Sequence, residues 1–234
     1  MERYGTRPET FAKVTVKARQ HACSNANAVF RDPVTVEQVL ASPTLFKSLT
    51  RLQACPPTNG AAAVIVCTSD FARAHNIDSG ARILGQGLAT DTAASFDPDD
   101  LSGVVGYGVT ERAAAVAYEQ AGLGPGDVDV VELHDCFTVS EILGYEALGL
   151  TAPGTSEKFI DAGDNTYGGR VVVNPSGGLL SKGHPIGATG LAQITELTQQ
   201  LRGAVADGRQ VKGARIGLQH NIGVGGAGVV TVVG

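Results

Sequence analysis

Residues 174–190, NPSGGLLSKGHPIGATG, are the stretch that decides the fold of this chain. They place one histidine, His184, between a glycine-rich turn and a helical pattern. Proline disfavours the α conformation in the residue before it, and its own fixed φ suits the first position of a helix. Because Pro185 follows His184, we predict that the histidine lies at the N-terminus of a helix and faces whatever binds there.

An apolar stripe supports that helix. Ile194, Leu197 and Leu201 recur at spacings of three and four residues, which is the period of one helix face. Gly203 follows the stripe, and glycine is the residue that most often ends a helix. The sequence therefore predicts a helix that begins close to Pro185 and ends near Gly203.

A second segment, residues 128–133, is a short β-branched run with the sequence VDVVEL. It follows the turn-forming residues 124–126, and such a run predicts a buried strand. His134, Asp135 and Cys136 come directly after it. The end of this strand is therefore a second place where reactive side chains gather.

A helix is predicted immediately beyond that strand. Thr138 and Glu141 occupy the ends of an S/T-x-x-E capping box, so the helix should begin near Thr138. Cys136 then lies at a strand-to-helix junction, where free N–H groups and the helix dipole favour the thiolate. We therefore expect Cys136 to be alkylated faster than the other cysteines. The residues expected on the inner side of the helix are Ile142, Leu143 and Leu148.

The C-terminal segment predicts a β-hairpin. Residues 214–219 and 228–233 have the composition of two strands, and the glycine-rich residues 221–226 between them suit a tight turn. His220 and Asn221 lie at the strand end nearest that turn. A third element end therefore carries side chains capable of chemistry.

Together the three element ends supply what an acyl-transfer site needs: a base, a thiol and donors to an oxyanion. Each side chain also has a simpler interpretation. His184 alone could cap a helix, and Cys136 alone could be a small buried apolar residue. The combination of His134, Cys136, His184 and His220 favours a catalytic site.

The same motifs resemble a known family. The HDCF of residues 134–137, the GHP of residues 183–185 and the HNIG of residues 220–223 resemble the thiolase superfamily, and within it the sterol carrier protein type. Most thiolases carry Asn-Glu-x-Phe at the first position and Cys-x-Gly at the last. Here His220 replaces the last cysteine and a cysteine stands in the first motif, as in that subfamily. Residues 164–193 also fit the family pattern.

The resemblance implies an α/β chain with the thiolase fold. It implies a complete layered αβα C-terminal domain over residues 79–234, preceded over residues 1–78 by a loop region and the last strand of an N-terminal domain. That strand corresponds to residues 55–69. A complete thiolase has two similar halves, about 350–400 residues in total, whereas this chain has 234. We therefore expect the family's nucleophilic cysteine to lie outside this chain.

The resemblance also implies a role for each motif residue in moving an acyl group through a covalent cysteine intermediate. His184 would deprotonate the nucleophilic cysteine and help hold the first thioester oxygen. Cys136 would shuttle the proton at the substrate α-carbon, which requires a thiol pKa tuned towards neutrality. His134 would orient a water or the thioester oxygen, and His220 would border the same pocket. The residues assigned to substrate binding are Asn221, Gly223, Ser176 and Gly183.

Three functions remain open. The first is an acyl-CoA thiolase or acetyl-CoA acetyltransferase that acts on CoA thioesters of fatty acids or sterol side chains, together with an N-terminal half. The second is a thiolase-like aldolase that cleaves a steroid side-chain CoA thioester, against which the presence of Cys136 argues. The third is a non-catalytic subunit that binds CoA thioesters or lipids. We expect CoA thioester as substrate, no bound cofactor or metal, and as partner a separate thiolase half or further copies of the chain.

Composition limits the classes of protein to which this chain can belong. Hydrophobic residues make up 43% and charged residues 18%, enough for the core of one or two domains. A net charge of −5 and a pI near 5.5 argue against a nucleic-acid partner. The cysteines show no CxxC pair, which disfavours a disulfide framework or a zinc site. They are Cys23, Cys55, Cys67 and Cys136.

No stretch approaches the ~20 apolar residues of a membrane span, and the N-terminus has no secretory signal pattern. The last residues are not a peroxisomal signal. We therefore expect a cytoplasmic protein.

Weaker patterns predict further elements along the chain. They are a short helix within residues 33–48, a buried strand at 61–66, the start of the second domain at 82–87, an exposed connection at 91–102 and a helix at 111–120 ended by Gly122.

Overall fold

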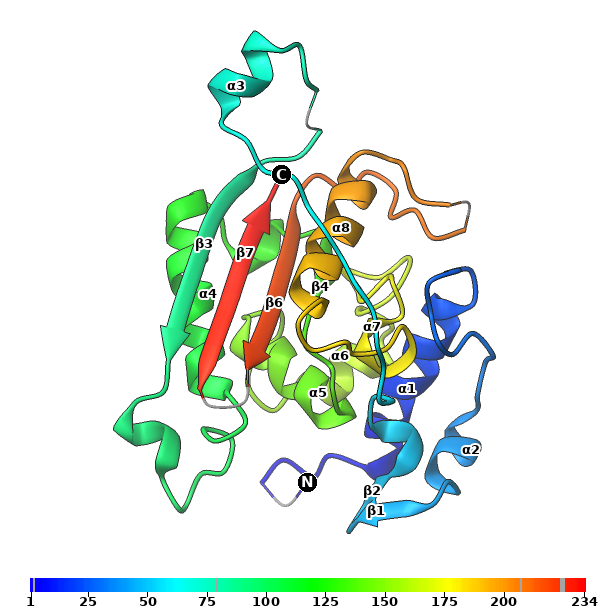
Figure 1. The fold of residues 1–234 in the computed structure, drawn as a ribbon. Coiled ribbons are helices and arrows are strands. Elements are labelled where there is room, and N and C mark those ends of the chain that lie inside the picture. The colour runs from blue at the N-terminus through cyan, green and yellow to red at the C-terminus, as the bar shows by residue number, and fades with distance from the viewer. Residues whose placement is uncertain (2, 79, 207, 224–225) are drawn as a thin grey trace.

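A five-stranded mixed sheet organises the chain in the computed structural model, which describes residues 1, 3–78, 80–206, 208–223 and 226–234 (Figure 1). The strand order is β3-β7-β6-β4-β5. β3, β7 and β6 pair antiparallel, whereas β6, β4 and β5 pair parallel. The strands are β3 (Ile83–Thr90), β4 (Val130–Glu132), β5 (Val172–Val173), β6 (Gly217–Gly223) and β7 (Ala227–Val233).

Helices surround this sheet, and a small ribbon lies apart from it. The ribbon pairs β1 (Thr44–Phe46) with β2 (Leu49–Thr50), which leads into the 3-10 turn η1 (Arg51–Gln53). The other 3-10 turns are η2 (Ala93–Phe96) and η3 (Pro125–Asp127). The helices are α1 (Pro8–Ala22), α2 (Val36–Leu40), α3 (Ser69–Ala74), α4 (Tyr107–Ala121), α5 (Thr138–Ala147), α6 (Ser156–Asp161), α7 (Gly178–Ser181) and α8 (Thr189–Leu201).

Both faces of the sheet are covered, so the expected αβα layering is confirmed. Neighbouring strand residues alternate between two cores: Val131 joins the larger core with α1, α4, α5 and α6, whereas Val130 joins the smaller one beneath α8. Leu197 of α8 fills the smaller core, with Ile194 and Leu201 packed against it. Figure 1 shows α4 behind the sheet and α8 in front of it. The sequence-predicted stripe of α8 is therefore the face that covers the sheet.

Two glycines bring α4 into direct contact with strand β3. A Cβ atom at Gly85 would lie 2.2 Å from the backbone oxygen of Ala117, and one at Gly87 would lie 2.0 Å from that of Ala113. Any side chain at these positions would push the helix away from the sheet. Small residues on both elements therefore allow α4 to pack at short distance against β3.

The register places the candidate segments at one edge of the sheet. β4 and β6 run parallel, with Val131 opposite Leu218 and Glu132 opposite Gln219. β5 runs parallel on the other side of β4, with Val173 opposite Val131. The carboxyl ends of parallel strands meet at the same edge. His134, Asn174 and His220 therefore emerge together, and the chain after Asn174 leads through α7 to His184.

Most predicted elements are confirmed with small shifts of their ends. α2 contains Val36, Val39 and Leu40, and α4 ends at Ala121, followed by Gly122, whose φ of 65° forms a left-handed cap. The C-terminal hairpin is present, although β6 continues through His220 and Asn221 to Gly223. Part of its predicted link, residues 224–225, lies outside the described residues. The connection at 91–102 is largely exposed.

The start of α5 is confirmed but its predicted capping box is wrong, and α8 starts later than predicted. α5 does begin at Thr138, but its N-cap is Phe137 and no side chain caps it, because Glu141 is instead buried in an ion pair with Lys17. α8 begins at Thr189 and not at Pro185, whose carbonyl accepts the N–H groups of Ala188 and Thr189 in a turn. His184 therefore precedes a turn that leads into the helix.

The buried strand predicted at residues 61–66 is absent. Ile65 is 98% exposed and Val66 is 73% exposed, and no strand is assigned between Pro56 and Thr68. A strand is stable only when a neighbouring strand binds its backbone groups, and this segment has no such neighbour along its length. It runs instead as an extended segment across α8 (Figure 1). The domain boundary predicted near residue 78 stays a prediction.

No helix within the described ranges is long and apolar enough to cross a membrane.

Candidate active site

His184 is held as a neutral base by the first residue of α8. Its Nδ1 lies 2.8 Å from Thr189 Oγ1, and that hydroxyl donates its own hydrogen to the carbonyl of Pro185 at 3.1 Å. Thr189 Oγ1 must therefore accept the Nδ1–H of the ring. In the neutral tautomer this leaves the lone pair on Nε2, to which no described residue forms a hydrogen bond. His184 is thus arranged to take up a proton.

His134 meets His184 edge to face. The two ring centroids are 4.8 Å apart and the planes are inclined by 89°. Asn221 Oδ1 is hydrogen-bonded to His134 Nδ1, so Nδ1 carries the proton. His134 Nε2 is then an acceptor only. Two neutral imidazoles from different segments therefore lie together at the sheet edge, each with its Nε2 atom free of bonds to the described chain.

His220 holds the backbone of His134 from within the core. It is 2% exposed, and its Nδ1 accepts the backbone N–H of His134 at 3.5 Å. The ring proton is therefore on Nε2, which donates to Thr110 Oγ1 at 3.0 Å. Because both ring nitrogens are bonded within the protein, His220 acts as a structural link between β6, α4 and the HDCF segment. Its neighbour Asn221 binds the His134 ring, and the catalytic role predicted for His220 stays a prediction.

All three imidazoles favour the neutral form. Burial lowers the pKa of His220 to about 3 and that of His134 to about 4, the latter against the opposing effect of the hydrogen bond that His134 donates to Asn221. Burial also lowers the pKa of His184, and the Lys182 ammonium lowers it further. At neutral pH, His184 therefore keeps the lone pair that a general base requires.

Replacing His220 by glutamine is expected to reduce the loss of stability towards acid. Histidines of the unfolded chain take up protons below pH ~6.5, whereas buried His220 stays neutral, so the folded state loses about 2 kcal/mol between pH 7 and pH 5 through this ring. Urea unfolding at the two pH values should show a drop smaller by that amount in His220→Gln. Exposed His75 offers the matched control, and a drop equal in His75→Gln and His220→Gln would refute the linkage.

Cys136 is a protonated thiol at rest, contrary to the thiolate predicted from its junction position. Burial raises its pKa, and the contact of its Sγ with Ser140 Oγ at 3.6 Å offsets only part of this effect. The backbone N–H groups of Cys136 and Phe137 also lower the pKa, but burial outweighs them. Cys23 and Cys67 are exposed. Faster alkylation of Cys136 is therefore no longer expected.

Asp135 connects the HDCF segment to the turn that carries His184. It is 0% exposed, and its carboxylate accepts the N–H groups of Leu179 at 2.7 Å and Leu180 at 3.4 Å. These donors belong to α7, which ends two residues before Gly183. Burial raises the pKa of Asp135 to about 7, and the charge of Glu141 adds to this. One side chain thus ties two of the three motifs together.

The residues assigned to substrate binding lie in different places. Ser176 is buried, and its N–H and Oγ bind the Glu132 carboxylate at 2.9 and 2.8 Å, so its hydroxyl is already engaged. Gly183 has φ 107°, and a Cβ there would lie 2.7 Å from Thr58 Oγ1. Gly223 ends β6. Of these four residues, only Asn221 is seen to form a hydrogen bond with the side chain of one of the site histidines.

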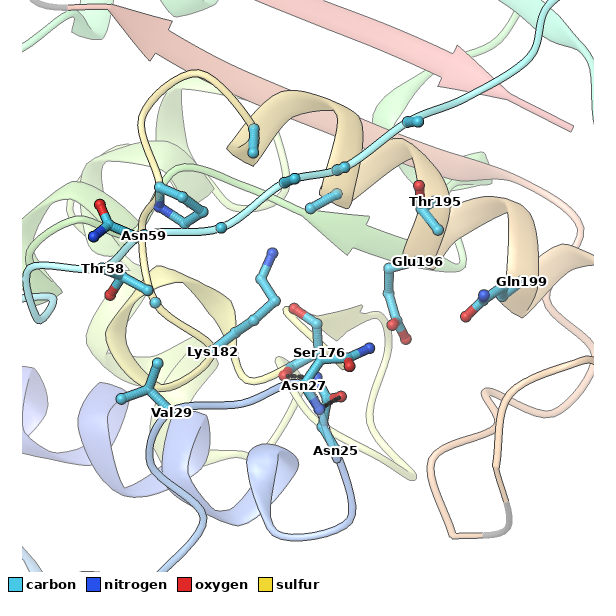
Figure 2. Close-up of a pocket in the computed structure, with 18 of the residues that line it drawn as sticks. Asn25, Asn27, Val29, Thr58, Asn59, Ser176, Lys182, Thr195, Glu196 and Gln199 are labelled. Atoms are coloured by element: carbon cyan, nitrogen blue, oxygen red, sulfur yellow. Dashed lines mark hydrogen bonds between the residues drawn. The ribbon is translucent and has the colours of Figure 1, made fainter.

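A cavity of about 400 Å³ borders the same turn from its other side. Ser176, Lys182 and Gly183 line it, together with the extended segment 58–63 and the exposed side of α8. Figure 2 shows Lys182 reaching into this space towards the extended segment, with Glu196 entering from α8. None of His134, Cys136 and His184 lines it. The cavity and the imidazole pair are therefore neighbouring but separate features.

Sequence reasoning missed the residues that set the tautomers. Thr189 lies within the quoted GATG motif, yet its hydroxyl became recognisable as a partner of His184 only once the turn was known. Thr110, which binds His220, lies on α4 more than a hundred residues away and gives no sequence signal. Asn221, in contrast, could be recognised from the sequence, because it directly follows His220 in the HNIG motif.

A family model described as "Thiolase C-terminal domain-like" matches residues 89–233. The chain belongs to the thiolase superfamily. The resemblance seen in the three motifs and the expected fold class are thereby confirmed.

Relatives of this thiolase chain point to the same subfamily. Sterol carrier protein 2 of Gallus gallus is 52% identical over 99% of the chain and 42% of its own length. An acetyl-CoA acetyltransferase of Methanothermobacter thermautotrophicus is 42% identical over 99% of the chain and 60% of its own length. The solved Ltp2–ChsH2(DUF35) aldolase superposes with a TM-score of 0.81 at 25% identity, covering 99% of this chain and 60% of that one. The chain thus spans about two fifths to three fifths of these relatives.

Proposed function

We propose that this chain supplies the acid–base part of an acyl-CoA thiolase site of the sterol carrier protein type. Its substrates would be CoA thioesters of fatty acids or sterol side chains. The observation that carries the proposal is the neutral His184, whose ring lies 4.8 Å from that of His134 at the sheet edge where the Cys136 thiol follows. A base and a separate acid at one edge are the pair that proton transfer in acyl exchange requires.

The first half of thiolysis uses the base. His184 Nε2 takes the proton from a nucleophilic cysteine supplied by an N-terminal thiolase half, and the cysteine sulfur bonds to the 3-keto carbon of the substrate. The protonated His184 can then donate a hydrogen bond to the developing oxyanion. Without that proton its Nε2 could only accept, so base and oxyanion donor are successive states of one ring.

The second half uses the acid. When the bond between the α- and β-carbons breaks, the departing acetyl-CoA carbon takes its proton from the Cys136 thiol. Burial raises the pKa of Cys136, contrary to the near-neutral pKa expected from the sequence, and this keeps the thiol protonated until it donates. Free CoA then gives its thiol proton to the Cys136 thiolate while its sulfur attacks the acyl-cysteine. The nucleophilic cysteine leaves and recovers its proton from His184, which restores every group.

His134 suits the positioning of a water in this scheme. Its Nδ1–H is bonded to Asn221, so Nε2 is an acceptor and cannot donate to a thioester oxygen. A water that donates to Nε2 has a second hydrogen for that oxygen. We therefore favour the water over direct contact with the thioester.

The test is a thiolysis assay with acetoacetyl-CoA and free CoA. The chain alone is expected to produce no acetyl-CoA, because the covalent intermediate needs a nucleophile from outside its motifs. Activity is expected when a separately produced N-terminal thiolase half is added. Acetyl-CoA formed by the pure chain would contradict the proposal that the nucleophile comes from the N-terminal half, and would point to Cys136 as nucleophile.

The products also separate the competing functions. The retro-aldol alternative is supported by the aldolase that superposes with a TM-score of 0.81. This alternative would be favoured if the reconstituted protein cleaved a β-hydroxyacyl-CoA without consuming CoA. Binding of CoA thioesters with no turnover in either assay would favour the non-catalytic subunit. We propose further that the chain works in the cytoplasm, paired with an N-terminal half or with further copies of itself.

A further inference from the structure

Cys55 and Cys136 face each other across a short stretch of antiparallel backbone. Ala54 and Phe137 form an isolated antiparallel bridge, and the Cys55 N–H donates to the Cys136 carbonyl at 2.9 Å. In an antiparallel ladder, the residue after one bridge partner lies opposite the residue before the other. Such a hydrogen-bonded pair has its Cα atoms about 5.5 Å apart.

That spacing lies within the range of disulfides, whose Cα atoms are roughly 4.4–6.8 Å apart. Side chains of directly opposed residues point to the same side of the ladder, with Cβ atoms about 4.5–5.5 Å apart. A disulfide needs the Cβ atoms slightly closer, at roughly 3.5–4.5 Å. The chain from Pro56 to Thr68 belongs to no strand or helix, so Cys55 can make this adjustment.

Two further observations distinguish this pair of thiols. Burial raises the pKa of Cys55 to about 11, and the charge of Cys136 is the next contributor to that rise. Cys55 and Cys136 are both half-buried, whereas Cys23 and Cys67 are exposed. The pair thus differs from the other cysteines in both geometry and environment.

We propose that Cys55 and Cys136 form a redox-modification site that closes to a disulfide when the chain meets a small-molecule disulfide such as glutathione disulfide. The thiolate of one cysteine attacks a sulfur of glutathione disulfide, forming a mixed disulfide and releasing one glutathione thiolate. The second cysteine thiolate attacks the protein-bound sulfur and releases the other glutathione. The two cysteines are oxidised and the glutathione disulfide is reduced, and the two protons lost by the cysteines pass through solvent to the two released glutathione thiolates.

The consequence for chemistry rests on the proposed function. Cys136 in a disulfide has no thiol proton to give to the acetyl-CoA carbon, so oxidation would switch off the acid of the site. Reduction by a dithiol would restore it. The site itself, as a property of the fold, does not depend on that role.

The experiment uses the full chain with Cys23→Ser and Cys67→Ser, which leaves only the proposed pair. Incubation with glutathione disulfide at pH 9 populates thiolate despite the raised pKa values. The expected product has lost the mass of two hydrogen atoms and yields a linked pair of tryptic fragments, residues 52–73 joined to 113–158. A product that stays unmodified, or that carries two separate glutathiones, would overturn the proposal.

Two controls sharpen the result. Cys55→Ser on the same background should stop at a single glutathione adduct. The double-serine variant unfolded in urea should give glutathione adducts in place of rapid ring closure, because closure depends on the native bridge. An equal yield of cross-link in the folded and unfolded chains would show that the geometry plays no part.

The regulatory consequence is measured separately with the N-terminal half present. Thiolysis by the double-serine variant should fall in proportion to the cross-linked product and return with dithiothreitol, whereas the Cys55→Ser form should lose activity only in proportion to the glutathione attached to Cys136. A cross-link without any thiolysis in the reduced protein would sink the proposed function and leave the redox site standing. Unchanged thiolysis in the fully cross-linked protein would refute the regulation.

Discussion

Replacing Lys17 by methionine is expected to lower the free energy of unfolding by about 3–5 kcal/mol. Lys17 of α1 forms an ion pair with Glu141 of α5, and the two side chains are 7% and 0% exposed. Its ammonium also lies 3.3 Å from the hydroxyl of Tyr145. Removing the ammonium leaves the Glu141 carboxylate in the core with hydrogen bonds from Tyr145 and Asn174 but no compensating charge. Chemical unfolding followed by circular dichroism measures the difference.

A matched variant lies on the same helix. Lys13 forms an ion pair with Asp161 at 2.5 Å, but these side chains are 39% and 35% exposed. Exposed pairs contribute roughly 0–1 kcal/mol, so Lys13→Met should change stability little. The double variant Lys17→Met/Glu141→Leu should regain much of the loss, because it removes both charges from the core. Equal effects of Lys13→Met and Lys17→Met would contradict the argument.

This ion pair also bears on how the chain is organised. α1 lies within residues 1–78, which the resemblance assigns to the loop region, yet Val14 and Ala18 belong to the same core as α5 and α6. Lys17 adds a buried charge contact to that packing. A large loss of stability in Lys17→Met would therefore show that the predicted boundary separates segments that fold together.

The periodicities of the sequence predicted single helices and strands, whereas its motifs predicted the site and carried the resemblance that implied the fold. The stripe containing Leu197 located α8, and the β-branched run ending at Leu133 located β4. The meeting of His134 and His184 followed from the rule that chemistry gathers at strand and helix ends. These signals are local, so they could be recognised without knowing which elements are neighbours in space.

The errors arose where a neighbour decides the outcome. Residues 61–66 have the composition of a strand but no strand beside them. Glu141 has the spacing of a capping box, but Lys17 draws it into the core. Cys136 stands at a helix start, where a thiolate would be stabilised, but burial outweighs the dipole and raises its pKa. In each case, a contact from a distant part of the chain overrides a correct local rule.

His184→Ala is expected to lower kcat/KM for thiolysis by the reconstituted protein about 100- to 10,000-fold, the range for loss of a general base. The effect should be this large because the ring serves as base and then as oxyanion donor. Steady-state thiolysis of acetoacetyl-CoA measures it. The exposed His75→Ala variant is the matched control and should keep full activity.

Thr189→Val separates the presence of the imidazole from its tautomer. Valine has the size of threonine but cannot accept the Nδ1–H of His184, which Thr189 Oγ1 binds at 2.8 Å. The proton is then free to occupy Nε2, where it blocks the lone pair that must take a proton from the nucleophile. We therefore expect a smaller loss than in His184→Ala, accompanied by a shift of the kcat/KM profile with pH, because the base is present but less often in its active form. Full activity in Thr189→Val with an unchanged pH profile would show that the hydroxyl does not set the tautomer, and full activity in His184→Ala would remove His184 from the mechanism altogether.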